Sequence, residues 1–215
     1  MSIDLAIAGA AIAGAVLGFV ADRLSVRWPA HEEGYQPRGL DWRTFVVVVT
    51  GAVVCSGLVA RWQADPRTLV LLAVVAVALV LLLATDLDQK ILPDLVTLPL
   101  IGLTAAILIV GWNPLLADKG LGLISGIAAG VAAPAFLFIT DRLIGGDLGD
   151  GDLKLAVSVG LLTGISLLVG GLLVASIGFS AVLLVLIATR RIGLRSAVPF
   201  GPVLILTAFV AVLVG

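Results

Sequence analysis

Residues 68–85 read TLVLLAVVAVALVLLLAT, and Asp86 follows directly. The run holds no charged residue over its 18 positions. An α-helix needs roughly 17–25 apolar residues to cross the hydrocarbon core of a bilayer. This stretch therefore predicts a membrane-spanning helix that ends at a carboxylate.

Similar apolar runs recur along the whole chain. Of its 215 residues, 60% are hydrophobic and 13% are charged, whereas soluble domains have about 45–50% apolar and about 25% charged residues. We predict an all-α, polytopic membrane protein with one integral-membrane domain over residues 1–215. The eight predicted transmembrane segments are residues 3–21, 44–60, 68–85, 95–112, 120–140, 153–163, 165–189 and 198–214. Gly160 and Gly164 leave open whether the sixth and seventh segments form one long bent helix.

The positive charges of the loops predict the orientation in the membrane. With the N-terminus outside, the inner loops are residues 22–43, 86–94, 141–152 and 190–197. Counting Lys154 at the mouth of its helix, the inner side holds ten Lys and Arg residues and the outer side three. Cytoplasmic loops carry an excess of these residues. We therefore predict that both termini lie outside, because a seven-segment chain would place the three arginines of residues 190–197 outside.

The composition excludes several classes of function. A net charge of −1 offers no basic surface for a nucleic acid. Cys55 is the only cysteine, so the chain has neither an intramolecular disulfide nor a CxxC metal site. We interpret Cys55 as a small core residue and the only histidine, His31, as a solvated loop residue. We expect no nucleic-acid partner, no metal site and no cofactor.

Acidic residues are concentrated in two of the inner loops. Seven of the fourteen lie in residues 86–94 and 141–152. A carboxylate at the membrane boundary is costly unless it is solvated or paired, so it is a candidate functional group. Helix capping is the alternative for Asp94 and Asp152, each of which begins a predicted helix. Capping does not account for Asp86, because negative charge is unfavourable at the C-terminal end of a helix.

Two facing aspartates can catalyse hydrolysis. Because like charges a few ångströms apart resist joint ionisation, such a pair shares one proton. The ionised partner takes a proton from water, and the protonated partner hydrogen-bonds the scissile carbonyl and later helps to protonate the leaving amine. The acidic loops hold no cysteine, and no Ser-centred motif accompanies His31, which argues against a Ser or Cys hydrolase.

Three motifs, in this order, resemble the type IV prepilin peptidase family of membrane aspartyl proteases. The first is Asp86-x-Asp88-x5-Asp94, the second is Gly149-x-Gly151-Asp152-x-Lys154, which is similar to the family's GxGD motif, and the third is Pro199-Phe200-Gly201-Pro202. The second motif begins about 65 residues after the first, and both are predicted on the inner face. The resemblance covers roughly residues 10–212.

The resemblance implies a function and a division of roles. Asp86 and Asp152 would be the catalytic pair, and the supporting residues would be Asp88, Asp94, Gly149, Gly151 and Lys154. The implied activity is endopeptidase cleavage of the leader peptide of prepilin-like proteins at the cytoplasmic face of the inner membrane. The implied partners are substrates with a hydrophobic N-terminal segment and the membrane lipids.

The chain departs from the family in its first inner loop. Many bacterial members carry two CxxC pairs there, and some also methylate the new N-terminus with S-adenosylmethionine. Residues 22–43 hold no cysteine and form a short loop. We therefore expect no zinc-binding module and weak or absent methyltransferase activity.

Two other functions stay open from the residues alone. One is a magnesium-dependent membrane transferase that handles lipids, with the metal on Asp86, Asp88, Asp150 and Asp152. No arginine-rich phosphate clamp lies beside these residues in the sequence. The other is a proton-coupled transporter, although the acids lie at predicted membrane edges and not at the bilayer centre.

Overall fold

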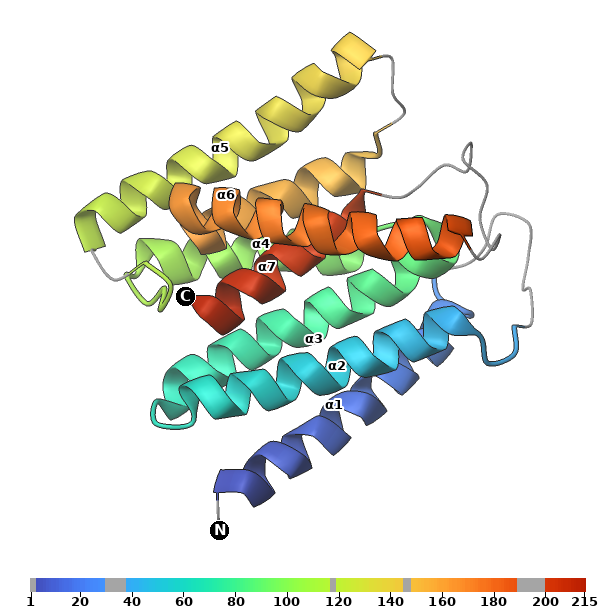
Figure 1. Ribbon diagram of the computed structural model, residues 1–215. Helices are drawn as coiled ribbons and strands as arrows, with labels where there is room; N and C mark the ends of the chain where they lie inside the picture. The colour runs from blue at the N-terminus through green and yellow to red at the C-terminus, as the bar shows by residue number, and fades with distance from the viewer. Residues whose placement is uncertain (1–2, 30–37, 117–118, 145–147, 189–199) are drawn as a thin grey trace. The chain divides into compact units, whose positions relative to one another are not determined.

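The computed structural model describes residues 3–29, 38–116, 119–144, 148–188 and 200–215. All regular structure within these ranges is helical (Figure 1). The helices are α1 (Ile3–Ser25), α2 (Trp42–Trp62), α3 (Pro66–Gln89), α4 (Asp94–Ile109), α5 (Lys119–Ile144), α6 (Asp150–Ala188) and α7 (Gly201–Val214).

The all-helical prediction is confirmed for the described residues. Five helices, namely α1, α2, α3, α5 and α6, are long and apolar enough to cross a membrane, and α4 and α7 are shorter apolar helices. These features fit a polytopic membrane protein. The count of eight crossings and the side of each terminus stay predictions.

The helices extend into the first three predicted inner loops, and the fourth, residues 190–197, lies outside the described residues. α3 continues three residues past Asp86, to Gln89, and α5 continues to Ile144. α3 ends because Lys90 takes up a left-handed conformation, with φ 56°, and its N–H closes the last turn onto the carbonyl of Asp86 at 2.9 Å. Asp86 therefore lies within the last turn of α3 and not beyond it.

The chain divides into two compact units, Met1–Leu100 and Ile101–Gly215. In the first unit, α1, α2 and α3 pack against one another. α1 and α2 approach most closely at glycines: a Cβ added to Gly14 would lie 2.1 Å from the carbonyl oxygen of Gly51, and one added to Gly18 would lie 2.4 Å from that of Val47. Small residues allow helix backbones in membranes to approach in this way.

In the second unit, α5 and the first part of α6 run antiparallel. Gly160 of α6 lies against Ala129 of α5, and Gly164 lies against Ser125. Farther along α6, Gly171 lies against Thr207 of α7. Each of these glycines removes the Cβ that would otherwise meet the neighbouring helix, so the packing of both pairs depends on small residues.

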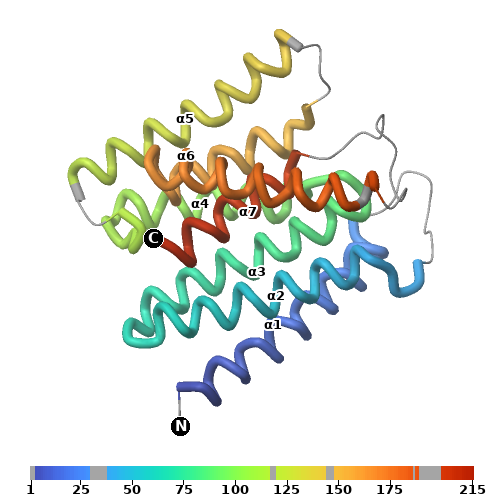
Figure 2. Tube along the Cα trace, viewed as in Figure 1, coloured from blue at the N-terminus to red at the C-terminus, as the bar shows by residue number. Residues whose placement is uncertain are grey.

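The backbone of α6 breaks at Gly164, with φ 63° and ψ −179°. Figure 2 shows the chain turning back within α6, so that its second half runs in the opposite direction to its first. The amide nitrogen of Asn113 donates to the carbonyls of Leu161 and Leu162 at 3.3 and 2.9 Å. The hydroxyl oxygen of Ser125 accepts from the N–H of Ile165 at 2.9 Å.

These two side chains satisfy backbone groups that the break leaves without helical partners. Such groups are costly in a bilayer unless they are bonded inside the protein. Asn113 is buried, with 8% of its surface exposed, and it also accepts from the N–H of Leu115. The break thus falls between the sixth and seventh predicted segments.

Candidate active site

Asp86 lies in the last turn of α3, whereas the sequence predicts it as the first residue of an inner loop. Only 3% of its surface is exposed. The Lys90 turn, described above, ends the helix at Gln89. A buried carboxylate at a helix C-terminus is opposed both by desolvation and by the helix dipole. The fold therefore holds Asp86 where its negative charge is costly.

Asp88 points away from Asp86, because residues two apart lie about 200° apart around a helix. Its carboxylate faces two arginines. Arg43 Nη1 lies 3.1 Å from Asp88 Oδ1, and Arg38 Nε lies 3.3 Å from the same oxygen. Asp88 is therefore bound into ion pairs on one face of α3, whereas Asp86 lies on another.

Asp22, at the end of α1, is almost wholly buried, with 1% of its surface exposed. It forms ion pairs with Arg23 and with Arg38, whose Nη2 lies 2.5 Å from Asp22 Oδ1. The hydroxyl of Thr44 donates to Asp22 Oδ2 at 2.9 Å. The loop-side charges of α1 and α2 thus form a buried polar cluster.

Gln89 makes a second connection between α3 and the end of α1. Its amide nitrogen donates to the carbonyls of Ser25 and Pro29 at 2.6 and 3.0 Å. Asp94, by contrast, is exposed at the first residue of α4. Within the first unit, the structure therefore brings Asp88 and Gln89 against the described parts of residues 22–43.

The second motif begins α6 in the other unit. Asp152 is the third residue of α6, and its N–H donates to the carbonyl of Gly149 at 3.0 Å. The carboxylate of Asp152 turns back toward Gly149, and its Oδ2 lies 3.9 Å from the place of a Cβ built on that glycine. The other carboxylate oxygen, Oδ1, is buried and has no hydrogen-bond partner in the described part of the chain.

Asp141 bonds the residue that directly precedes the second motif. It lies near the end of α5, and its Oδ1 accepts from the N–H of Leu148 at 3.0 Å. Gly151 and Lys154, in the first turns of α6, are half-buried. Sequence reasoning placed Asp141 in an acidic loop but gave it no role, because a bond across seven residues leaves no periodic signal.

Several predicted residues lie outside the described ranges. They are His31, Asp147, Arg190, Arg191, Arg195 and Pro199. Within residues 3–29, 38–116, 119–144, 148–188 and 200–215, no group of three or more His, Cys, Asp or Glu side chains could hold a metal ion. Asp86 and Asp152 belong to different units, so each half of the candidate site stands by itself.

Comparison with known proteins adds one relative. Over 197 residues, the chain is 32% identical to the prepilin leader peptidase/N-methyltransferase of Pseudomonas putida. The chain is similar to a prepilin leader peptidase. The similarity covers 90% of this chain and 60% of that peptidase, so the chain spans about three fifths of the peptidase's length. No protein-family profile matches the chain, and no solved structure matches it significantly.

Proposed function

We propose that the chain is a membrane aspartyl endopeptidase that removes the leader peptide of prepilin-like proteins at the cytoplasmic face of the inner membrane. The observation that carries this proposal is the similarity to the Pseudomonas putida prepilin leader peptidase over most of the chain. The five long apolar helices support a multi-pass membrane location. The substrates would present a hydrophobic N-terminal segment among the membrane lipids.

We assign the chemistry to Asp86 and Asp152. One carboxylate, ionised, takes a proton from the attacking water, and the other, protonated, hydrogen-bonds the scissile carbonyl. The buried position of Asp86 and the unsatisfied Oδ1 of Asp152 support these roles. Gly149 and Gly151 shape the turn before Asp152, and Asp88, Asp94 and Lys154 support the two motifs.

The comparison does not favour the two alternatives. The relative is a peptidase, and it is neither a magnesium-dependent lipid transferase nor a proton-coupled transporter. The name of the relative also includes an N-methyltransferase. We keep the expectation that this chain methylates weakly or not at all, because its first loop is short and lacks cysteine.

The function is tested by co-expressing the protein with candidate prepilins and measuring the intact mass of each product. We expect the substrate to lose its leader peptide and to keep a free α-amine. Unprocessed substrate in every pairing would refute the peptidase. A gain of one methyl group that requires this protein and S-adenosylmethionine would refute the expectation on methylation.

The proposed topology predicts a pattern of cysteine labelling. In a Cys55→Ala background, we expect Ala64→Cys, at the exposed turn between α2 and α3, to react with an impermeant maleimide in cells with a permeable outer envelope and an intact inner membrane. Ile91→Cys and Leu143→Cys, which are also exposed positions, should react only after the inner membrane is opened. Labelling of either inner position before opening would contradict the orientation.

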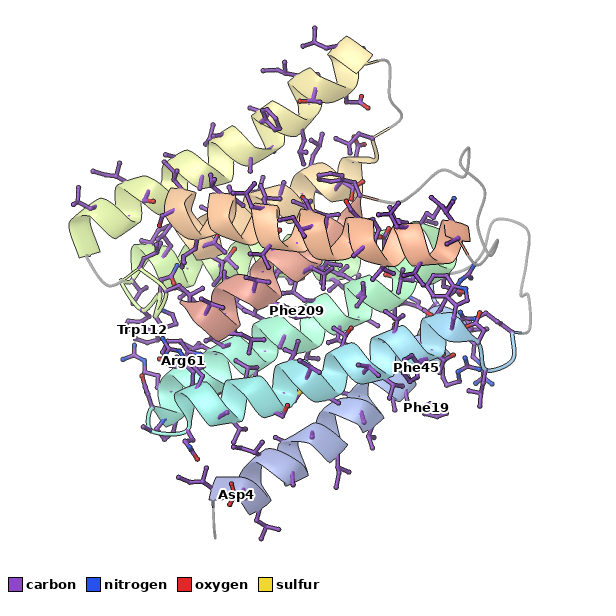
Figure 3. The ribbon with its side chains drawn as sticks, in the orientation of Figure 1. Asp4, Phe19, Phe45, Arg61, Trp112 and Phe209 are labelled. Atoms are coloured by element: carbon purple, nitrogen blue, oxygen red, sulfur yellow. The ribbon has the colours of Figure 1, made fainter. Side chains whose placement is uncertain are left out.

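Aromatic residues near the ends of α1 and α2 fit helices that span a membrane. In Figure 3, Phe19 and Phe45 lie toward one end of α1 and α2, and Asp4 and Arg61 lie toward the other. The guanidinium of Arg23 lies 5.9 Å from the Phe19 ring centre, and that of Arg61 lies 5.3 Å from the Trp62 ring centre. Trp, Tyr and basic side chains commonly anchor spanning helices at the membrane interface.

A further inference from the structure

Arg38 contacts three carboxylates from three parts of the first unit. Its guanidinium lies 2.5 Å from Asp22 at the end of α1, 3.1 Å from Asp41 before α2, and 3.3 Å from Asp88 near the end of α3. The Arg38 side chain is 16% exposed, and that of Asp22 is 1% exposed. Because these contacts are largely removed from water, they are screened less than surface ion pairs.

The guanidinium suits this position better than an ammonium group would. It is planar and directs five N–H donors from a rigid fork, so one side chain can bond several carboxylates at fixed angles. Arg38 hydrogen-bonds Asp22 through Nη2 and Asp41 through Nη1, and its Nε forms an ion pair with Asp88 at 3.3 Å without a hydrogen bond. A lysine would keep the positive charge but would lose the fixed geometry.

Arg38 and Arg43 contact α3 on the face opposite Asp86, through Asp88. Binding Asp88 to Arg38 and Arg43 fixes the rotation of the last turn of α3. Since Asp86 shares that turn, its direction is fixed as well. The hydrogen bonds that Gln89 donates to the carbonyls of Ser25 and Pro29 also fix this turn of α3 against the end of α1.

We propose that Arg38 is a positioning residue: through Asp88 and Asp22 it sets the direction in which Asp86 faces its substrate. The proposal rests on the proposed function, because it concerns the same site. It assigns to Asp88 an ion-pairing role in place of a chemical one. It also assigns to residues 38–44 the task of joining the ends of α1 and α3.

The test compares Arg38→Lys and Arg38→Gln with Arg61→Lys, a change at an exposed arginine at the other end of α2. We expect Arg38→Lys to lower kcat for a prepilin peptide at least about tenfold, with KM within about twofold, because small misplacements at a reacting centre can cost about 100-fold. Adding Asp88→Asn to Arg38→Lys should cost little more, because both changes break the same connection. Arg61→Lys should leave kcat unchanged.

A second measurement separates positioning from overall stability and from the peptidase assignment. In a Cys55→Ala background, the reaction rate of Asp86→Cys with a maleimide reports the exposure of that position. We expect Arg38→Lys to change this rate at equal thermal stability. An unchanged kcat and an unchanged labelling rate in both Arg38 variants would overturn the proposal, as would a loss of kcat that only matches a loss of folded protein. If the wild-type protein cleaves no prepilin, the peptidase assignment fails, and the labelling rate alone decides whether Arg38 positions residue 86.

Discussion

Asp86→Asn and Asp152→Asn are each expected to abolish cleavage of a co-expressed prepilin while the protein stays folded and inserted. An amide cannot act as the base that activates water, and it removes the proton that the two carboxylates share. General acid–base catalysis contributes about 10²–10⁴-fold, and groups that act as a unit give strongly non-additive losses. The double variant should therefore be little worse than either single one. Initial rates, normalised to the amount of protein in the membrane, measure the effect.

Asp94→Asn is the matched control, since Asp94 is an exposed aspartate at the first residue of a helix. It should keep much more activity than Asp152→Asn. A pure capping role for Asp152 makes the opposite prediction, because asparagine caps a helix nearly as well as aspartate does. Near-normal cleavage by Asp86→Asn or by Asp152→Asn, at equal membrane levels, would contradict the assignment of the catalytic pair.

Gly14→Ala is expected to cause the largest loss of stability that a single methyl group can cause in α1. The added Cβ would lie 2.1 Å from the carbonyl oxygen of Gly51. The obstacle is backbone, so no side chain can turn aside, and α1 must move away from α2. Overpacking of this kind costs about 1–3 kcal/mol or more. Thermal unfolding of the purified protein in lipid nanodiscs measures the loss.

Gly9→Ala supplies the control for this change. Gly9 lies in the same helix, and nothing lies within 4 Å of a Cβ added there. The two variants thus share the same chemical change and the same helix, and they differ only in the neighbouring backbone. Equal stability of Gly14→Ala and Gly9→Ala would show that α1 and α2 do not approach at Gly14 as described.

The helical type of the elements could be predicted from the sequence, because a bilayer span requires a long uncharged run. The ends could not. The apolar run of residues 68–85 stops at Asp86, yet α3 continues to Gln89. Backbone hydrogen bonds continue through polar residues until Lys90 turns the chain. Hydrophobicity reports which residues avoid water, and it does not report where the helical hydrogen bonds end.

The candidate site could be predicted only in part. Its acidic motifs stand out in the sequence because carboxylates are rare at membrane edges. The cluster around Arg38 does not stand out, because Arg38 and Asp88 are far apart in the chain and their pairing follows no period. Charges of both signs in residues 22–43 were the available signal. The sequence predicts an inner loop at these residues, whereas the structure makes Asp22 one of the most buried polar groups of the described chain.

The break at Gly164 also bears on the order in which the chain is made. Asn113 precedes the carbonyls that it bonds by 48 and 49 residues, and Ser125 precedes the amide that it bonds by 40. Both polar partners are therefore synthesised before the ribosome reaches the break. The growing chain can therefore form the hydrogen bonds to the carbonyls of Leu161 and Leu162 and to the N–H of Ile165 as these groups enter the bilayer, before α7 is made.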